Sequence, residues 1–193
     1  MLNLEFPGRR QLIEAIDLAV TKPDTAALTG SLRQSLCRLM HGGEVQLPEC
    51  VFTPFADHYA RRELYRSDEH GYCVVAMTWA PGQGTPIHDH DGMWCVEGVW
   101  HGALEIEQYD LVEHTAERYN FTGVGSIQAS AGSAGSLIPP HEYHSIRNPS
   151  ADTVTVSVHV YAGPMLRCAV FEPIQDSLWY SRNVHTLGLD RVQ

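Results

Sequence analysis

The sequence contains no long hydrophobic run, no cluster of basic residues and no pair of closely spaced cysteines. No segment approaches the ~18 consecutive apolar residues that a membrane span requires, and the N-terminal segment lacks the uninterrupted apolar region of a signal peptide. No run of five Lys or Arg residues occurs and the formal net charge is −10, which argues against a nucleic-acid or membrane surface. We therefore expect a cytoplasmic protein, a monomer or weak homo-oligomer, whose partners are small molecules and include no nucleic acid and no membrane.

The cysteines form an odd, scattered set without a CxxC pair, which makes a poor disulfide framework. We expect free thiols, and leave open that one of them is functional. The five are Cys37, Cys50, Cys73, Cys95 and Cys168.

The length of 193 residues favours a single domain. Apolar residues recur at helical spacing over residues 9–21 and 24–41, which predicts two amphipathic helices. Pro23 and Asp24 supply the break between them, and Gly42-Gly43 ends the second.

From about residue 60 to residue 172, short runs rich in Val, Ile, Thr, Tyr and Trp alternate with turn clusters, which is typical of a β-sandwich or barrel. We interpret a Gly/Ser/Ala-rich stretch at 123–136 as a turn-rich pair of loops. The predicted organisation is a helical extension at about 1–45, a β-barrel at about 58–172 and a C-terminal tail at 173–193. The clearest strands are 72–79, 94–99, 103–109 and 153–161.

His88 and His90 form a His-x-His pair. On a strand, residues i and i+2 project from the same face about 7 Å apart, so both imidazoles can reach one metal ion. An isolated pair of this kind is more often two surface histidines, so the flanking sequence decides between the two interpretations.

The flanking residues resemble the two motifs of the cupins. Gly82, the His-x-His pair and Gly102 match the first motif, except that Cys95 stands where that motif has a glutamate; Pro139, His144 and Asn148 match the second. The resemblance implies a mainly β fold, a jelly-roll-like cupin β-barrel with two or three N-terminal α-helices.

With Cys95 in place of the glutamate, the implied ligand set is three neutral histidines, His88, His90 and His144. Glu97 lies two residues further along the strand, about 7 Å from the expected ligand position. Three neutral ligands leave the full charge of a divalent ion and open positions for an anionic substrate and dioxygen.

A three-histidine cupin with this cysteine resembles the cysteine dioxygenases. Ser157-Val-His159-Val-Tyr161 matches a motif that lines the family's substrate pocket, and Cys95 with Tyr161 occupies the positions of its Cys–Tyr thioether crosslink. Cys168 matches a family cysteine near the pocket mouth. The resemblance spans roughly residues 58–172.

The resemblance also implies a substrate-binding motif, Tyr-x-Arg, matched by Tyr59-Ala-Arg61. Arg62 would fit the family arginine without a gap, whereas Arg61 requires a one-residue insertion; Tyr59 favours Arg61. The arginine would pair with the substrate carboxylate.

The implied activity is that of an Fe(2+) enzyme that adds both atoms of dioxygen to the thiol of L-cysteine, giving cysteine sulfinic acid. Tyr161 would hydrogen-bond substrate or oxygen, oriented by His159, which Ser157 holds in turn. The runner-up substrate is 3-mercaptopropionate, although bacterial relatives that prefer it typically carry glutamine for the arginine and glycine for the cysteine. A zinc or nickel hydrolase or isomerase, and a ligand-binding cupin without activity, stay open as other classes.

Residues outside the motifs have structural interpretations. The polar face of residues 153–161 is expected to point into the barrel, with the alternate valines on the other face. We interpret His101, His114 and His141 as structural or exposed, although His141 could compete with His144 for the metal. Trp79, Trp94 and Trp100 are expected to pack in the β core.

Overall fold

The chain folds into two N-terminal helices followed by two antiparallel β-sheets, as a computed structural model shows for residues 4–191. The helices are α1 (Arg9–Val20) and α2 (Thr25–Gly42). The Asp24 side chain caps α2 by accepting a hydrogen bond from the Ala27 N–H at 2.8 Å, and Gly43 ends the helix in the left-handed conformation, φ 70°. Both predicted helices and their break are confirmed, and a 3-10 turn, η1 (Glu49–Phe52), follows them.

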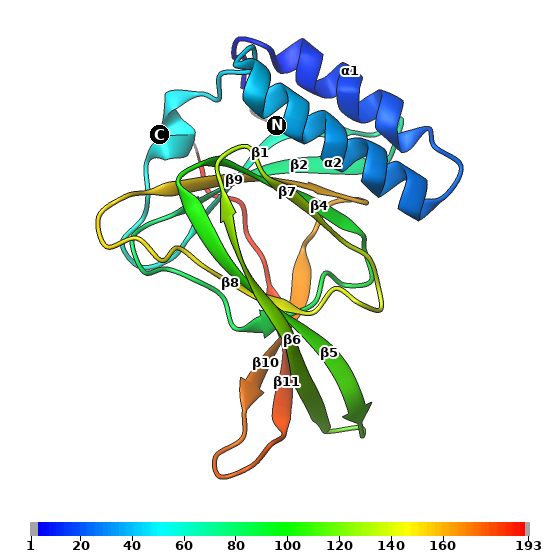
Figure 1. Cartoon of the computed structure of the whole chain (residues 1–193), viewed down its shortest axis with the longest axis vertical. Coiled ribbons are helices and arrows are strands. Elements are labelled where there is room, and N and C mark those ends of the chain that lie inside the picture. Colours follow the sequence, from blue (N-terminus) through cyan, green and yellow to red (C-terminus); the bar gives the residue numbers. More distant parts are fainter. Residues whose placement is uncertain (1–3, 192–193) are drawn as a thin grey trace.

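The strands form a five-stranded sheet in the order β1-β2-β9-β4-β7 and a closed arrangement β10-β11-β6-β5-β8-β3. The helices lie on one side, over the five-stranded sheet, and the hairpins β5-β6 and β10-β11 extend to the opposite end (Figure 1). The prediction of a mainly β fold with N-terminal helices is confirmed. The strands are β1 (Ala60–Ser67), β2 (Tyr72–Trp79), β3 (Ile87–His88), β4 (Cys95–His101), β5 (Ala103–His114), β6 (Arg118–Ser130), β7 (Ala134–Leu137), β8 (His144–Arg147), β9 (Thr155–Tyr161), β10 (Arg167–Pro173) and β11 (Tyr180–Thr186).

Strand β9 is buried along its whole length because both faces of its sheet are covered. Val156, Val158 and Val160 pack with the helices in one core. The alternate residues face the space between the sheets, where His159 and Tyr161 are each 2% exposed. The expected polar interior face is therefore present, and the helices explain why the valine face is also buried.

Two predicted boundaries need correction. The β region continues past residue 172, because β11 pairs with β10 and with the start of β6, so the described part of the predicted tail at 173–193, which ends at residue 191, contains a strand. The Gly/Ser/Ala-rich stretch at 123–136 belongs mostly to strands β6 and β7. Gly123 and Gly125 pair with β5, and this tertiary pairing overrides their weak strand propensity.

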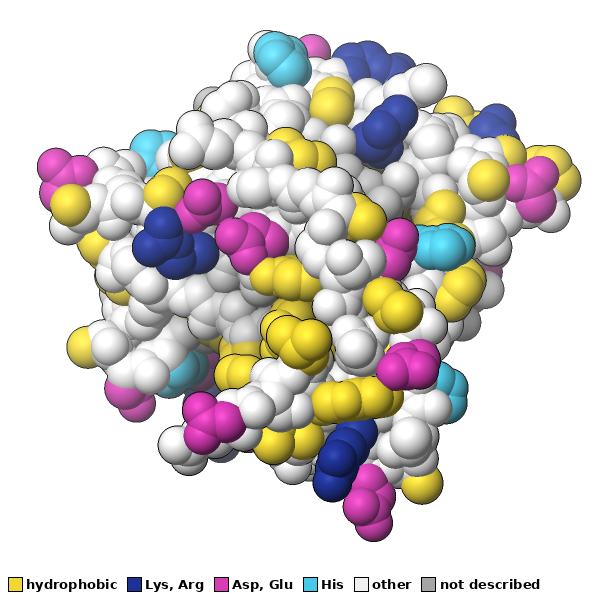
Figure 2. All heavy atoms as spheres, turned by 60° about the horizontal axis from the view of Figure 1, so that its bottom comes forward, with side chains coloured by type: hydrophobic (Ala, Val, Ile, Leu, Met, Phe, Trp, Pro, Cys, Tyr) yellow, Lys and Arg dark blue, Asp and Glu magenta, His cyan; other side chains and the backbone are white. Residues whose placement is uncertain are grey.

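The end of the molecule away from the helices is fastened by an aromatic cluster. Phe171 of β10 and Phe121 of β6 pack edge to face with ring centroids 4.9 Å apart, and Tyr143 and Tyr180 join them. Hydrophobic side chains gather on this side among acidic and basic ones (Figure 2).

Within residues 4–191, no helix combines the length and the hydropathy that crossing a membrane would need.

Candidate metal centre and substrate pocket

Three buried histidines converge between the sheets. His88 ends β3, His90 follows it, and His144 begins β8, where it is the direct pairing partner of His88. One ring nitrogen from each lies within 4.8 Å of the others, and the Nε2 atoms of His88 and His144 are 3.1 Å apart. The two sequence motifs, more than fifty residues apart, thus meet at one point because β3 and β8 are neighbours.

The electrostatics of this cluster suit a cation. Burial lowers the pKa of each of the three imidazoles, so they are neutral at neutral pH and offer lone pairs. His88 donates from Nδ1 to the Pro86 carbonyl oxygen at 3.1 Å, which leaves Nε2 as its free lone pair. Neutral imidazoles are good ligands for iron and other divalent transition metals, so the donor set fits the implied Fe(2+).

Two other candidates lie outside this cluster. The His141 side chain is 79% exposed, with Nδ1 3.7 Å from Asp110, so it does not compete with His144. Glu97 points to His159, with its Oε2 3.4 Å from Nδ1 of that ring. His101 and His114 are exposed, as expected.

A pocket is lined by His88 and His90 of this cluster, and its wall contains five further residues that the family resemblance singled out. These are Tyr59, Arg61, His159, Tyr161 and Cys168. Met77, Trp79, Met165 and Leu187 complete much of the apolar lining. The free space is about 20 Å³, room for about one water molecule, so the pocket is narrow beside His88 and His90.

Arg61 and Arg62 leave β1 on opposite faces. Arg61 reaches the pocket wall, where its guanidinium donates to the carbonyl oxygens of Gly188 and Met165 at 2.9 and 3.2 Å. Arg62 turns away and donates to the Thr53 carbonyl oxygen at 2.7 Å. The alternation of side chains along a strand therefore separates the two candidates.

The Arg61 guanidinium is buried without a carboxylate partner among the described residues: Arg61 is 5% exposed and forms no ion pair there. A buried charge held only by carbonyl oxygens is costly and attracts an anion. This end of the pocket is thus suited to a carboxylate, while the histidine end is suited to a metal.

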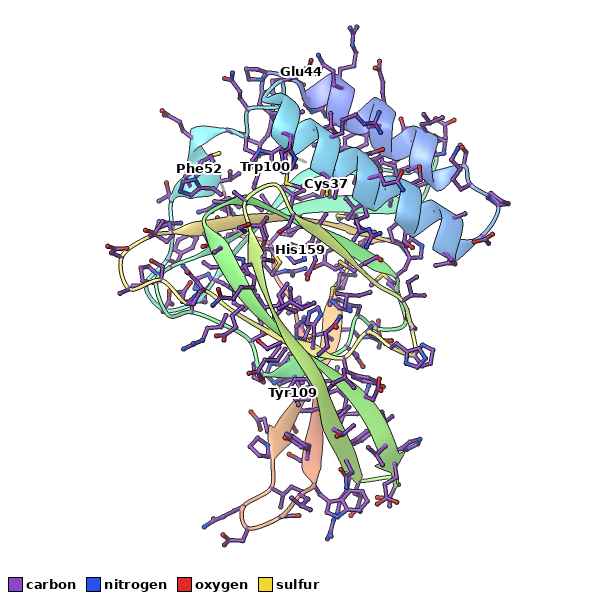
Figure 3. The ribbon with its side chains drawn as sticks, viewed as in Figure 1. Cys37, Glu44, Phe52, Trp100, Tyr109 and His159 are labelled. Atoms are coloured by element: carbon purple, nitrogen blue, oxygen red, sulfur yellow. The ribbon has the colours of Figure 1, made fainter. Side chains whose placement is uncertain are left out.

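Ser157, His159 and Tyr161 share the interior face of β9, but only the first two are hydrogen-bonded to each other. Ser157 Oγ and His159 Nε2 are 2.8 Å apart, and Trp79 donates its indole N–H to the same Oγ at 2.9 Å. His159 and Tyr161 stack with centroids 5.9 Å apart, and the Tyr161 hydroxyl contacts Met77 Sδ at 3.9 Å. We expected His159 to orient Tyr161, and in the structure it contacts the Tyr161 ring by stacking and not by a hydrogen bond. His159 points from β9 into the space between the sheets (Figure 3).

Cys95 and Tyr161 are direct cross-strand partners on β4 and β9. Burial, and next the nearby Glu97 carboxylate, raise the pKa of the Cys95 thiol well above its ordinary value. Cys95 Sγ lies 4.0 Å from Nδ1 of His159. Burial likewise raises the pKa of the Tyr161 phenol, and the Arg61 charge opposes it. All five cysteines lie within the described residues and none forms a disulfide, as expected.

Trp79, Glu97 and Asp190 were missed as site residues. The sequence did hold a signal for Trp79: a tryptophan expected in the core needs a hydrogen-bond acceptor for its indole N–H. Asp190 Oδ2 accepts the Arg61 backbone N–H at 2.8 Å across 129 positions of sequence, and no local pattern reports that contact.

A model of the protein family described as cysteine dioxygenase type I matches residues 41–173, which include both histidine motifs and the Ser157–Tyr161 strand. The chain is also similar to TT1209 from Thermus thermophilus, at 18% identity over 62% of this chain and 97% of that chain, with a TM-score of 0.47. A protein with a double-stranded beta-helix domain from Klebsiella pneumoniae subsp. pneumoniae matches at 18% identity over 66% and 98%, with a TM-score of 0.49. Oxalate oxidase in complex with glycolate matches at 17% identity over 60% and 61%, with a TM-score of 0.44.

Proposed function

The chain belongs to the cysteine dioxygenase type I family, and from this membership we propose that it is an iron-dependent enzyme that oxidises L-cysteine with O2 to cysteine sulfinic acid. Both oxygen atoms add to the thiol sulfur, so one thiol and one dioxygen give one sulfinic acid with no other reactant. The observation that carries the proposal is a buried arginine without an acidic partner beside a cluster of three buried histidines.

His88, His90 and His144 would hold the iron. Because all three are neutral, they would leave its positive charge uncompensated, ready for an anionic ligand. Bound iron would supply a Lewis acid that favours the thiolate and a redox centre that reacts with dioxygen.

Arg61 would bind the substrate carboxylate. A guanidinium can form a bidentate pair with a carboxylate, which fixes both its position and its orientation. The carbonyls of Gly188 and Met165 hold the Arg61 side chain in the pocket wall before substrate arrives. The arginine itself then needs little reorganisation on binding, whereas the narrow pocket must widen to admit the substrate.

Tyr161 would donate a hydrogen bond inside the pocket. Burial keeps the pKa of its phenol well above the ordinary value, so the hydroxyl retains its proton at neutral pH. His159 stacks against this ring, and Ser157 with Trp79 fixes His159 through Nε2. A Cys95–Tyr161 thioether would hold the phenol more rigidly, and the pairing of β4 with β9 favours its formation. The new C–S bond replaces the thiol S–H and one ring C–H, and dioxygen, the co-substrate of the proposed reaction, would take up the two electrons and two protons.

The pocket lining bears on the choice of substrate. The described lining residues include no carboxylate that could receive the ammonium group of cysteine. The amine would therefore need an open position on the metal. 3-Mercaptopropionate lacks the amine and needs only Arg61 and a sulfur site, so it is the second candidate substrate.

Oxygen uptake tests the proposal. Iron-loaded protein is assayed with L-cysteine, 3-mercaptopropionate and cysteamine, which is cysteine without its carboxylate. We expect uptake of one O2 per cysteine, a product heavier by two oxygen atoms, and a much lower kcat/KM for cysteamine. Zinc-loaded protein serves as the matched control and should consume no oxygen. Absence of thiol-dependent uptake by the iron-loaded protein would overturn the proposal in favour of a hydrolase, isomerase or binding protein.

A further inference from the structure

A second cavity lies behind the candidate site, on the far side of His159. Its volume is about 300 Å³, and Glu97 and Ser157 form part of its wall. Leu104 and Ile106 of β5 contribute apolar lining. The exposed residues Gln128 and Arg33 also line it, so the cavity communicates with solvent.

Glu97 faces His159 from this cavity. It lies two residues after Cys95 on β4, which places both side chains on the interior face, and it is 6% exposed. Its Oε2 is 3.4 Å from His159 Nδ1 and has no hydrogen-bond partner within residues 4–191. A buried carboxylate oxygen so placed is costly unless it shares a proton with the nitrogen that it faces.

The other nitrogen of His159 limits where its proton can lie. Trp79 N–H is a donor only, so Ser157 Oγ accepts from it and keeps its own hydrogen available. When Ser157 donates to His159 Nε2, the imidazole proton lies on Nδ1 and points to Glu97. When Nε2–H donates to Ser157, Nδ1 has a lone pair, to which a protonated Glu97 at 3.4 Å can donate; the Cys95 thiol, a weak donor, lies further away at 4.0 Å.

The charges around the pair decide which arrangement is populated. Burial raises the pKa of Glu97 to about 7 and lowers that of His159 to about 3, the latter assisted by the Arg61 charge and by His88. Cys95 on β4 and Tyr161 on β9 both face the pair and keep their protons, since burial raises both pKa values. His159 is therefore neutral near pH 7, where Glu97 changes protonation.

We propose that Glu97 is a positioning residue that shares one proton with Nδ1 of His159 and thereby sets which imidazole nitrogen donates toward Ser157. As pH rises, Glu97 transfers its proton to Nδ1, and the Nε2 proton leaves through the Ser157 hydroxyl to the solvent in the cavity. No bond between heavy atoms changes and no oxidant is involved. The link to catalysis rests on the proposed function, whereas the tautomer change does not.

Nitrogen NMR of ¹⁵N-histidine-labelled protein tests this directly, because protonated and unprotonated ring nitrogens have distinct shifts. The protein is loaded with diamagnetic zinc, and the His159 signals are assigned by comparison with His159→Gln. In the wild type we expect the proton to move from Nε2 to Nδ1 with a midpoint near pH 7. In Glu97→Gln the tautomer should stay constant over the same range.

Leu104→Val is the matched control, since it alters the wall of the same cavity from the opposite sheet and should keep the wild-type titration. A single wild-type tautomer from about pH 5.5 to pH 8.5 would overturn the proposal, as would an unchanged titration in Glu97→Gln. Neither result depends on turnover, so failure here is distinct from failure of the proposed activity.

Kinetics supply the second readout. Glu97 does not line the substrate pocket, so Glu97→Gln should leave KM for L-cysteine nearly unchanged. We expect kcat to fall by about 10-fold, the lower end of the loss seen when a group that orients a metal-bound histidine is removed, and its pH dependence near 7 to flatten. A rise in KM with unchanged kcat would contradict a positioning role.

Discussion

Asp190 holds Arg61 by two hydrogen bonds. Its Oδ2 accepts the Arg61 backbone N–H at 2.8 Å, and its own N–H donates to the Arg61 carbonyl oxygen at 2.7 Å. The segment that carries Asp190 also supplies the Gly188 carbonyl oxygen that receives the Arg61 guanidinium. The residues after β11 thus hold both the backbone and the side chain of Arg61, and the guanidinium lies in the pocket wall.

Arg61→Ala should lower kcat/KM for L-cysteine by at least about 30-fold, because a carboxylate that loses its charged partner in a buried pocket loses roughly 2 to 5 kcal/mol. Arg62→Ala is the matched control, since its side chain lies on the other face of β1. Steady-state oxygen uptake at equal iron content measures both. A large loss in Arg62→Ala alone would refute the assignment of Arg61 to the carboxylate.

Arg61→Gln should shift preference toward 3-mercaptopropionate, because an amide still donates to a carboxylate but has no charge and a shorter reach. The quantity compared is the ratio of kcat/KM for the two thiols in wild type and variant. The proposed substrate is wrong if the wild type already prefers 3-mercaptopropionate.

His144→Ala should abolish both iron retention and thiol oxidation, because two neutral imidazoles hold a divalent ion weakly. The control is His141→Ala, which removes an exposed ring outside the cluster and should keep both properties. Elemental analysis after desalting gives the iron content. Full iron in the His144→Ala protein would show that the ligand set is different.

Protein taken after turnover should run as two bands on a denaturing gel if Cys95 and Tyr161 form a thioether, with the faster species lighter by two hydrogen atoms. Their direct pairing across β4 and β9 motivates the expectation. Cys95→Gly should give one band and retain part of the activity. A single mass equal to that of the uncrosslinked chain after extended turnover would remove the crosslink from the proposed site.

The sequence predicted those features that depend on residues close together along the chain. The Asp24 cap, the alternation along β9 and the spacing of His88 and His90 each depend on residues a few positions apart. The contacts of Glu97 and Asp190 depend on which strands become neighbours, so only the folded chain reveals them.

Glu97→Gln should raise the stability of the protein at alkaline pH. Burial moves the Glu97 pKa from its ordinary value of 4.5 to about 7, so the folded state binds this proton more tightly than the unfolded state. For such an acid the unfavourable contribution is absent below about pH 4.5, grows as pH rises, and is complete above about pH 7. At about 1.4 kcal/mol per pKa unit, it amounts to roughly 3 to 4 kcal/mol. Urea denaturation at several pH values should therefore show a variant that resembles wild type near pH 4.5 and is more stable near pH 8, with Leu104→Val destabilised equally at both. A stability difference that does not change with pH would mean that Glu97 titrates normally in the folded protein.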